Sequence, residues 1–192
     1  MWTPEQVERH NKCYQRGFDL IEGLVLIDGK PRPVIGRAEE SRLNEAISQF
    51  EEALKINEKN TGCMMMMGKI YQVLKRHDLA LQWFSRACST EPSNHIAFRE
   101  ASIAAMELEK YNEAHYYAYS AVKLKPNNAS LLCNLSLVLL FLGRLDPALD
   151  ALRQALFYDP NDDISKKLYY VIERIKLQKL PIPKNHKELS KY

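Results

Sequence analysis

The sequence predicts an all-α fold in which pairs of helices stack into a solenoid. Two observations carry this prediction: small residues recur in columns at a fixed interval, and each interval has room for two helices and a short turn. A repeat of this length is typical of solenoid proteins, because one helix pair cannot bury its apolar face alone and must stack on its neighbours.

Alanine forms two columns with a spacing of 34 residues, and proline forms a third. The first column is Ala46, Ala80, Ala114 and Ala148. The second, seven residues later, is Ala53, Ala87, Ala121 and Ala155, and the prolines Pro92, Pro126 and Pro160 follow it by five residues. Both alanines lie on one face of the second helix of each pair, where small side chains let neighbouring helices approach. The prolines end that helix.

The repeated columns resemble the tetratricopeptide repeat family, a 34-residue helix pair with small, aromatic and proline residues at fixed places. Residues 61–94 match the pattern best, with Met64, Met67, Gly68, Tyr71, Ala80, Phe84, Ala87 and Pro92. Residues 95–128 and 129–162 carry Ser102 and Ser136 in the glycine column, which keeps the volume small. The resemblance implies a right-handed superhelical solenoid, with first helices lining a concave groove and second helices forming the convex back.

The two ends of the chain depart from the regular pattern. Residues 1–60 are expected to be a divergent first repeat, whose first helix covers about residues 4–22. The distance from Gly17 to Ala46 exceeds the family spacing, which predicts a loop insertion near residues 24–40. After the fourth repeat we expect a capping helix over 163–179 and an extended tail over 180–192, since Pro181 and Pro183 disfavour helix.

Four consecutive methionines, Met64 to Met67, stand in the first helix of the second repeat. Consecutive helical residues point in nearly all directions, so the four cannot share one core. Met64 and Met67 belong to packing columns, and the resemblance implies that Met65 and Met66 face the groove. Methionine is flexible and suits surfaces that bind varied apolar partners. The alternative is that all four methionines fill the core.

The groove columns of the family, carried onto this sequence, imply a peptide-binding surface on the first helices. Leu137, Leu140 and Phe141 would form an apolar patch that monomers seldom leave bare. A partner peptide or helix, the chain's own tail, or a second copy of the chain could cover it. The groove residues are Met65, Met66, Lys69, Gln72, Arg99, Ile103, Met106, Asn134, Leu137, Leu140, Phe141, Lys167 and Arg174.

The charged groove residues suggest one ligand type and argue against another. Lys69, Arg99, Lys167 and Arg174 could hold an acidic residue within a mostly apolar ligand. Some family members grip a C-terminal carboxylate through a set of Lys, Asn and Arg residues. Here the matching columns hold mostly unsuitable residues, so that clamp is not expected: Met66, Lys69, Ile96, Glu100, Ser130 and Asn134.

The sequence shows no pattern of catalytic or metal-ligating residues. The four cysteines and five histidines are scattered without ligand spacing, and no nucleophile motif or glycine-rich phosphate loop is present. We therefore expect no enzyme activity, no metal and no cofactor. A net charge of +3 does not favour nucleic acid as a partner. The polar N-terminus, the lack of a spanning apolar run and the unpaired cysteines favour a cytoplasmic protein without membrane association.

The sequence thus predicts a non-enzymatic protein–protein interaction module, an adaptor or chaperone-like protein that binds a largely apolar peptide or helix in the groove. The alternative is a structural or self-assembling subunit, possible as a homo-oligomer, whose groove is filled by its own tail or by another copy.

Overall fold

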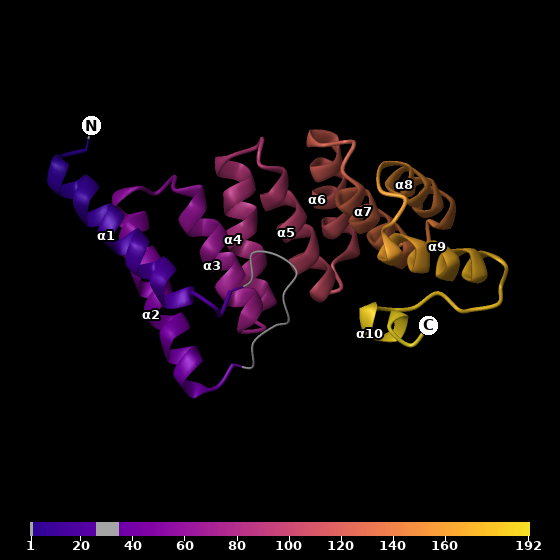
Figure 1. The fold of residues 1–192 in the computed structure, drawn as a ribbon, viewed down its shortest axis with the longest axis horizontal. Helices are drawn as coiled ribbons and strands as arrows, with labels where there is room; N and C mark the ends of the chain where they lie inside the picture. Colours follow the sequence, from indigo (N-terminus) through magenta and orange to yellow (C-terminus); the bar gives the residue numbers. More distant parts are fainter. Residues whose placement is uncertain (1, 26–34) are drawn as a thin grey trace. The chain divides into compact units, whose positions relative to one another are not determined.

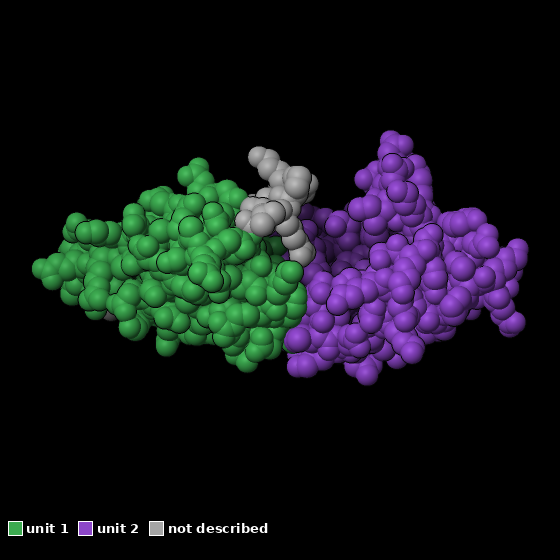
Figure 2. Space-filling model, turned by 90° about the horizontal axis from the view of Figure 1, so that it is seen from below, with its two compact units in different colours: residues 1–92 green, residues 93–192 purple. Residues whose placement is uncertain are grey.

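The structure is a computed structural model that describes residues 2–25 and 35–192. These residues form ten α-helices and no strand, so the predicted all-α repeat fold is confirmed (Figure 1). The chain divides into two compact units, residues 1–92 and residues 93–192 (Figure 2). The central part of the insertion predicted near residues 24–40 lies outside the described residues.

Unit 1 contains the first two helix pairs. The first pair is α1 (Pro4–Ile21) and α2 (Arg37–Ile56), and the second is α3 (Thr61–Val73) and α4 (His77–Thr90). The helices pack within each pair, and α2 contacts α3. At the start of α1, the Thr3 hydroxyl accepts from the Gln6 amide at 3.2 Å, and the Gln6 side chain accepts from the Thr3 amide at 2.9 Å. This reciprocal arrangement satisfies two backbone donors that the helix cannot satisfy itself.

Unit 2 contains two further pairs and the C-terminal helices. Helix α5 (His95–Glu107) pairs with α6 (Tyr111–Leu124), and α7 (Ala129–Phe141) pairs with α8 (Leu145–Tyr158). Helix α9 (Asp163–Lys176) packs on α8. The tail differs from the expected extended segment, because His186–Leu189 form one helical turn, α10. Pro181 and Pro183 precede this turn and so do not interrupt it.

The glycine column explains how the two helices of a pair come together. A Cβ atom on Gly68 would lie 2.5 Å from the Phe84 ring, and one on Gly17 would lie 2.7 Å from the Phe50 ring. Both phenylalanine side chains are wholly buried, so these contacts lie inside the core. In unit 2 the smaller Ala118 and Leu152 stand in the phenylalanine column. Serine can therefore replace glycine in the facing helices.

A column of polar residues starts the first helix of each of the three later repeats and also starts α9. It holds Asn60, Asn94, Asn128 and Asp162, again 34 residues apart. Each side-chain oxygen accepts a hydrogen bond from a backbone amide in the first turn, at 3.0 to 3.2 Å. Such N-caps replace bonds that the first turn of a helix lacks. The sequence analysis did not identify this column, although it has the same spacing as the alanines.

The methionine run of α3 is mostly core. Met64 and Met67 are wholly buried, Met65 is 8% exposed and Met66 is half-buried. The expectation that Met65 presents its side chain is therefore wrong, and Met66 alone of the four offers appreciable surface. Across the described ranges, no helix combines the length and apolar character needed to cross a membrane.

Candidate functional site

Unit 2 contains a cavity of about 800 Å³, which we call the unit 2 cavity. Its walls are the first helices α5 and α7 together with α9, and its remaining edge is the C-terminal end of the chain. Apolar side chains dominate the walls, with polar and charged groups among them. The lining includes Ile103, Leu137, Ile164, Leu168, Val171 and Leu189, with Arg99, Ser130, Cys133, Asn134, Asp159, Asp162, Lys167 and Tyr170.

The structure brings five of the predicted groove residues together in this lining. They are Arg99 and Ile103 on α5, Asn134 and Leu137 on α7, and Lys167 on α9. Arg99 and Lys167 belong to one column of the repeat and Ile103 and Leu137 to another, so the 34-residue period places the members of each pair on the same wall. Asn134 stands one residue after the Arg99 column. Their contact with a peptide remains a prediction.

Arg99 does not present an isolated positive charge. Its Nη2 donates to Oε1 of Glu100 at 2.8 Å, and the Glu100 side chain is almost wholly buried. A buried carboxylate needs a partner, because its removal from water is costly. Arg99 thus compensates the charge of Glu100, while its buried Nε has no hydrogen-bond partner among the described residues, so contact of Arg99 with an acidic residue of a ligand stays a prediction. The exposed Lys167 is the remaining predicted cation on the lining.

Asn134 is held in a defined orientation. Its Nδ2 donates to the Oγ of Ser102 at 3.2 Å, joining α7 to α5. The side-chain oxygen is therefore the end of the amide that remains to accept a hydrogen bond. The serine that replaces glycine in the third repeat thus also positions a side chain of the cavity.

Three predicted groove residues do not form an exposed patch. Leu140 is 0% exposed and Met106 is 9% exposed, so both belong to the core of unit 2. Phe141 is half-buried, and its ring stacks on Tyr111 with centroids 5.0 Å apart. The predicted apolar patch of Leu137, Leu140 and Phe141 is therefore wrong for Leu140, while Phe141 keeps a half-buried ring. The column comparison missed that the helix turns Leu140 inward and that Tyr111 covers Phe141.

The other predicted residues lie outside the cavity lining. Arg174 lies on α9. Its Nη1 donates to the Tyr170 hydroxyl at 2.9 Å, and its guanidinium lies over the Tyr170 ring. Four residues lie on α3 of unit 1 and are at least half-buried: Met65, Met66, Lys69 and Gln72. Their role in a peptide groove remains a prediction.

The chain's own tail was one of the three occupants that the sequence left open for the groove, and its last residues do lie at the cavity. Leu189, Ser190 and Tyr192 belong to the lining. A signal for α10 was present: Asn185 is followed three residues later by Glu188, a spacing typical of a helix start. The contacts of Lys184 and Asn185 with the α5–α6 turn had no such signal, because they join residues more than seventy positions apart in the sequence.

No group of three or more potential metal ligands occurs among the residues that the structure describes. Cys133 lies on the cavity wall, and burial raises the pKa of its thiol, which disfavours the reactive thiolate. Burial also raises the pKa of Cys63 and of Cys88 to about 12.

The fold and this cavity define a helical-repeat scaffold, a class that generally presents surfaces for protein interaction and does not itself catalyse reactions. Comparison with known families specifies it further. Residues 62–94 match one tetratricopeptide repeat profile, and residues 105–169 match a second. The chain belongs to the tetratricopeptide repeat family.

Several known proteins are similar to this chain. Sperm-associated antigen 1 of Mus musculus is 26% identical over 98 residues, which is 51% of this chain and 11% of that protein. The chain thus spans about a tenth of the length of that relative. YrrB, described as a repeat protein with an unusual peptide-binding site, is 22% identical with a TM-score of 0.64 over 72% of each chain.

MamA of Desulfovibrio magneticus RS-1 is 14% identical, with a TM-score of 0.73 over 88% of this chain and 86% of that one. At these identities the structural matches show the shared fold alone. Tetratricopeptide repeats generally act as protein-interaction scaffolds, and this coarse function applies to the chain.

Proposed function

We propose that this protein is an adaptor or chaperone-like module that binds a largely apolar segment of another protein in the unit 2 cavity. The observation that carries the proposal is the cavity itself, with a volume of about 800 Å³ and walls formed by the first helices of successive repeats. Ligand sites are commonly concave, mostly apolar and of this size, with a few polar groups that set orientation.

The lining suggests how affinity and orientation would be divided. Ile103, Leu137 and Ile164 offer apolar surface on three helices of the cavity, α5, α7 and α9. At about 25 cal/mol per Å² of buried apolar area, a few partner side chains suffice for micromolar binding after the costs of association. The oriented amide of Asn134 and the ammonium group of Lys167 would fix the direction of the bound segment.

The alternative occupant, the chain's own tail, has partial support. The C-terminal segment contributes to the lining, yet a cavity of about 800 Å³ remains beside it. The segment thus covers one edge of the site, and the walls away from that edge remain open. We also propose a cytoplasmic location, since the four cysteines are free thiols and a reducing compartment keeps them so.

A matched pair of charge reversals tests the proposal. Lys167 and Lys166 are adjacent exposed residues of α9, and only Lys167 lines the cavity. We expect Lys167→Glu to weaken capture of protein partners from a native lysate, and Lys166→Glu to leave capture unchanged. Leu137→Glu should abolish capture, while Leu124→Glu, at an exposed position of α6, should not. Equal capture by all four variants would exclude the cavity as the binding site.

A further inference from the structure

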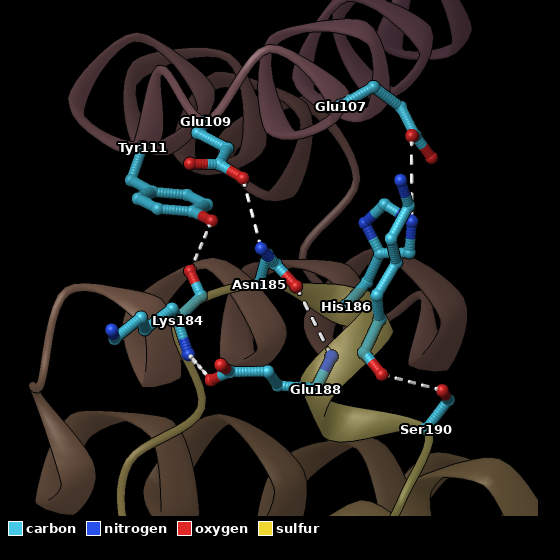
Figure 3. Close-up of polar contacts among 9 residues, drawn as sticks. Glu107, Glu109, Tyr111, Lys184, Asn185, His186, Glu188 and Ser190 are labelled. Carbon is cyan, nitrogen blue, oxygen red and sulfur yellow. Dashed lines mark hydrogen bonds and ion pairs between the residues drawn. The ribbon is translucent and has the colours of Figure 1, made fainter.

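The C-terminal segment, residues 177–192, turns back after α9 and reaches the turn between α5 and α6 (Figure 1). Figure 3 shows its three polar contacts there. The Tyr111 hydroxyl donates to the carbonyl oxygen of Lys184 at 2.6 Å, and Nδ2 of Asn185 donates to Oε1 of Glu109 at 3.0 Å. The third contact joins Nε2 of His186 to Oε2 of Glu107 at 3.6 Å and becomes an ion pair when His186 is protonated.

The same segment is part of the unit 2 cavity. Pro183 is wholly buried just before the polar contacts, and Leu189, Ser190 and Tyr192 line the cavity just after them. The hydroxyl of Tyr192 also donates to the carbonyl oxygen of Pro181 at 3.1 Å, which closes the segment on itself. One set of contacts therefore holds a short piece of chain against an edge of the proposed binding site.

The segment is attached much more weakly than the helices beside it. Helix α10 has four residues, none of them buried, whereas α9 buries five. The three polar contacts involve groups that are largely exposed, where water competes for each hydrogen bond. Elements with few buried apolar groups and exposed hydrogen bonds open at a low free energy compared with global unfolding.

We propose that residues 180–192 form a releasable lid over the unit 2 cavity, held by Glu107, Glu109 and Tyr111, and that a partner segment must displace this lid to bind fully. The inference rests on the proposed function, since it assigns a form of regulation to the same site. The occupant of the edge is the chain's own segment, because only residues 177–183 separate the end of α9 from the contact at Lys184.

Asn185 is the residue at which the lid can be opened selectively. Its Oδ1 accepts from the Glu188 amide at 3.2 Å and caps α10, while its Nδ2 donates to Glu109. Asn185→Asp keeps an acceptor for the cap, loses the donor and places a carboxylate against Glu109. Adding Glu109→Gln to this variant supplies an amide donor and restores the contact.

Glu109 offers a second variant that separates the lid from the fold. Its φ of 57° lies in the left-handed region, where the next repeat has Gly143 with a φ of 71°. Glycine adopts this conformation without steric cost. Glu109→Gly therefore removes the acceptor for Asn185 while easing the backbone of the α5–α6 turn, so lid opening is not confused with unfolding.

Cys133 reports on cavity access without any partner, because it is half-buried on the cavity wall. The experiment measures its rate of alkylation by N-ethylmaleimide in the full chain, with peptide mass spectrometry to separate it from Cys13, a half-buried thiol of unit 1. We expect Asn185→Asp, Glu109→Gly and deletion of residues 180–192 each to raise the Cys133 rate by about fivefold or more, roughly the effect of losing one hydrogen bond. The Asn185→Asp/Glu109→Gln pair should return to within about twofold of wild type, and the Cys13 rate should not change.

Unchanged Cys133 alkylation in the deletion variant and in Asn185→Asp would overturn the lid. Protection of Cys133 that disappears on dilution would overturn it too, because the segment would then come from a second copy. The lid test uses no partner, so a failure of the proposed function leaves its result standing. Conversely, if the lid proposal is overturned, the expected difference in capture between Lys167→Glu and Lys166→Glu still tests the proposed function.

Discussion

The ring of Tyr111, at the start of α6, stacks on the ring of Phe141, at the end of α7, with centroids 5.0 Å apart and planes at 26°. The Tyr111 hydroxyl donates to the carbonyl oxygen of Lys184. One side chain thus covers an apolar residue with its face and holds the C-terminal segment with its hydroxyl. Burial raises the pKa of Tyr111, and the charge of the nearby Glu109 raises it further. The hydroxyl therefore keeps, at neutral pH, the proton that it donates.

Tyr111→Phe separates these two roles. The stack on Phe141 should persist, so the midpoint of thermal unfolding should change little, by the equivalent of about 1 kcal/mol or less. Amide hydrogen exchange in residues 185–192 should become faster, because the segment loses one of its contacts. Tyr111→Ala should also make this exchange faster. Because it exposes Phe141, it should in addition lower the unfolding midpoint. Unaltered exchange in Tyr111→Phe would show that the hydroxyl contact does not hold the segment.

Gly68 is expected to tolerate no side chain while Phe84 faces it. A Cβ atom there would lie 2.5 Å from a ring that is wholly buried and has little room to move. We expect Gly68→Ala to lower the free energy of unfolding by about 1–2 kcal/mol, since overpacking outweighs the better helix propensity of alanine. Urea denaturation followed by circular dichroism measures this.

A compensating change gives the control for Gly68. Phe84→Leu in the same chain should recover part of the loss, because the fourth repeat already combines Ser136 with Leu152 in these columns. A Gly68→Ala variant as stable as wild type would mean that the helix pair can separate without cost, contrary to the packing described.

The two serines of the glycine column should respond in opposite ways. The Oγ of Ser136 is buried and has no hydrogen-bond partner among the described residues, whereas that of Ser102 accepts from Asn134. Ser136→Ala should leave the free energy of unfolding unchanged or raise it by up to about 1 kcal/mol, because an unsatisfied buried hydroxyl is removed. Ser102→Ala should lower it by about 1 kcal/mol, because Asn134 loses its acceptor. The same direction of change in both variants would contradict this assignment.

Acidification should weaken unit 2 through two of its histidines. Burial lowers the pKa of His95 and of His115 in the folded protein, and nearby cations lower it further. The unfolded chain then binds more protons than the folded chain near and below the ordinary histidine pKa of about 6.5, so stability falls as pH falls through that range. The fall in unfolding midpoint between pH 7.5 and 5.5 should be smaller in a His95→Gln/His115→Gln variant. A fall as large as that of wild type would refute the assignment.

The regular part of the fold could be predicted because its cause repeats in the sequence. The alanine columns place small side chains where helices pack closely. Gly68 and Phe84 also stand in columns of the repeat, and the Phe84 ring fills the space that Gly68 leaves. The caps Asn60, Asn94, Asn128 and Asp162 follow the same period and could have been found. Groove residues such as Ile103, Leu137 and Lys167 reached the cavity lining because neighbouring repeats place equal columns on one wall.

The remaining features depend on contacts that break the period. Tyr111 has His77 and Leu145 at the equivalent positions of the neighbouring repeats, so its contacts with Phe141 and Lys184 do not follow from the period. The pairing of Arg99 with Glu100 depends on the burial of one carboxylate, which the column comparison does not give. Leu140 was misjudged because a position that faces the groove in the family pattern is closed here by neighbouring side chains.

Binding of a partner in the unit 2 cavity can be tested with one photoreactive side chain inside the cavity and another outside it. Leu137→p-benzoylphenylalanine puts the reactive group on the cavity wall, and Tyr116→p-benzoylphenylalanine puts it on an exposed face of α6 that does not line the cavity. We expect ultraviolet crosslinking to a partner protein from position 137 and none from position 116. Crosslinks from position 116 alone would contradict the claim that the unit 2 cavity is the binding site.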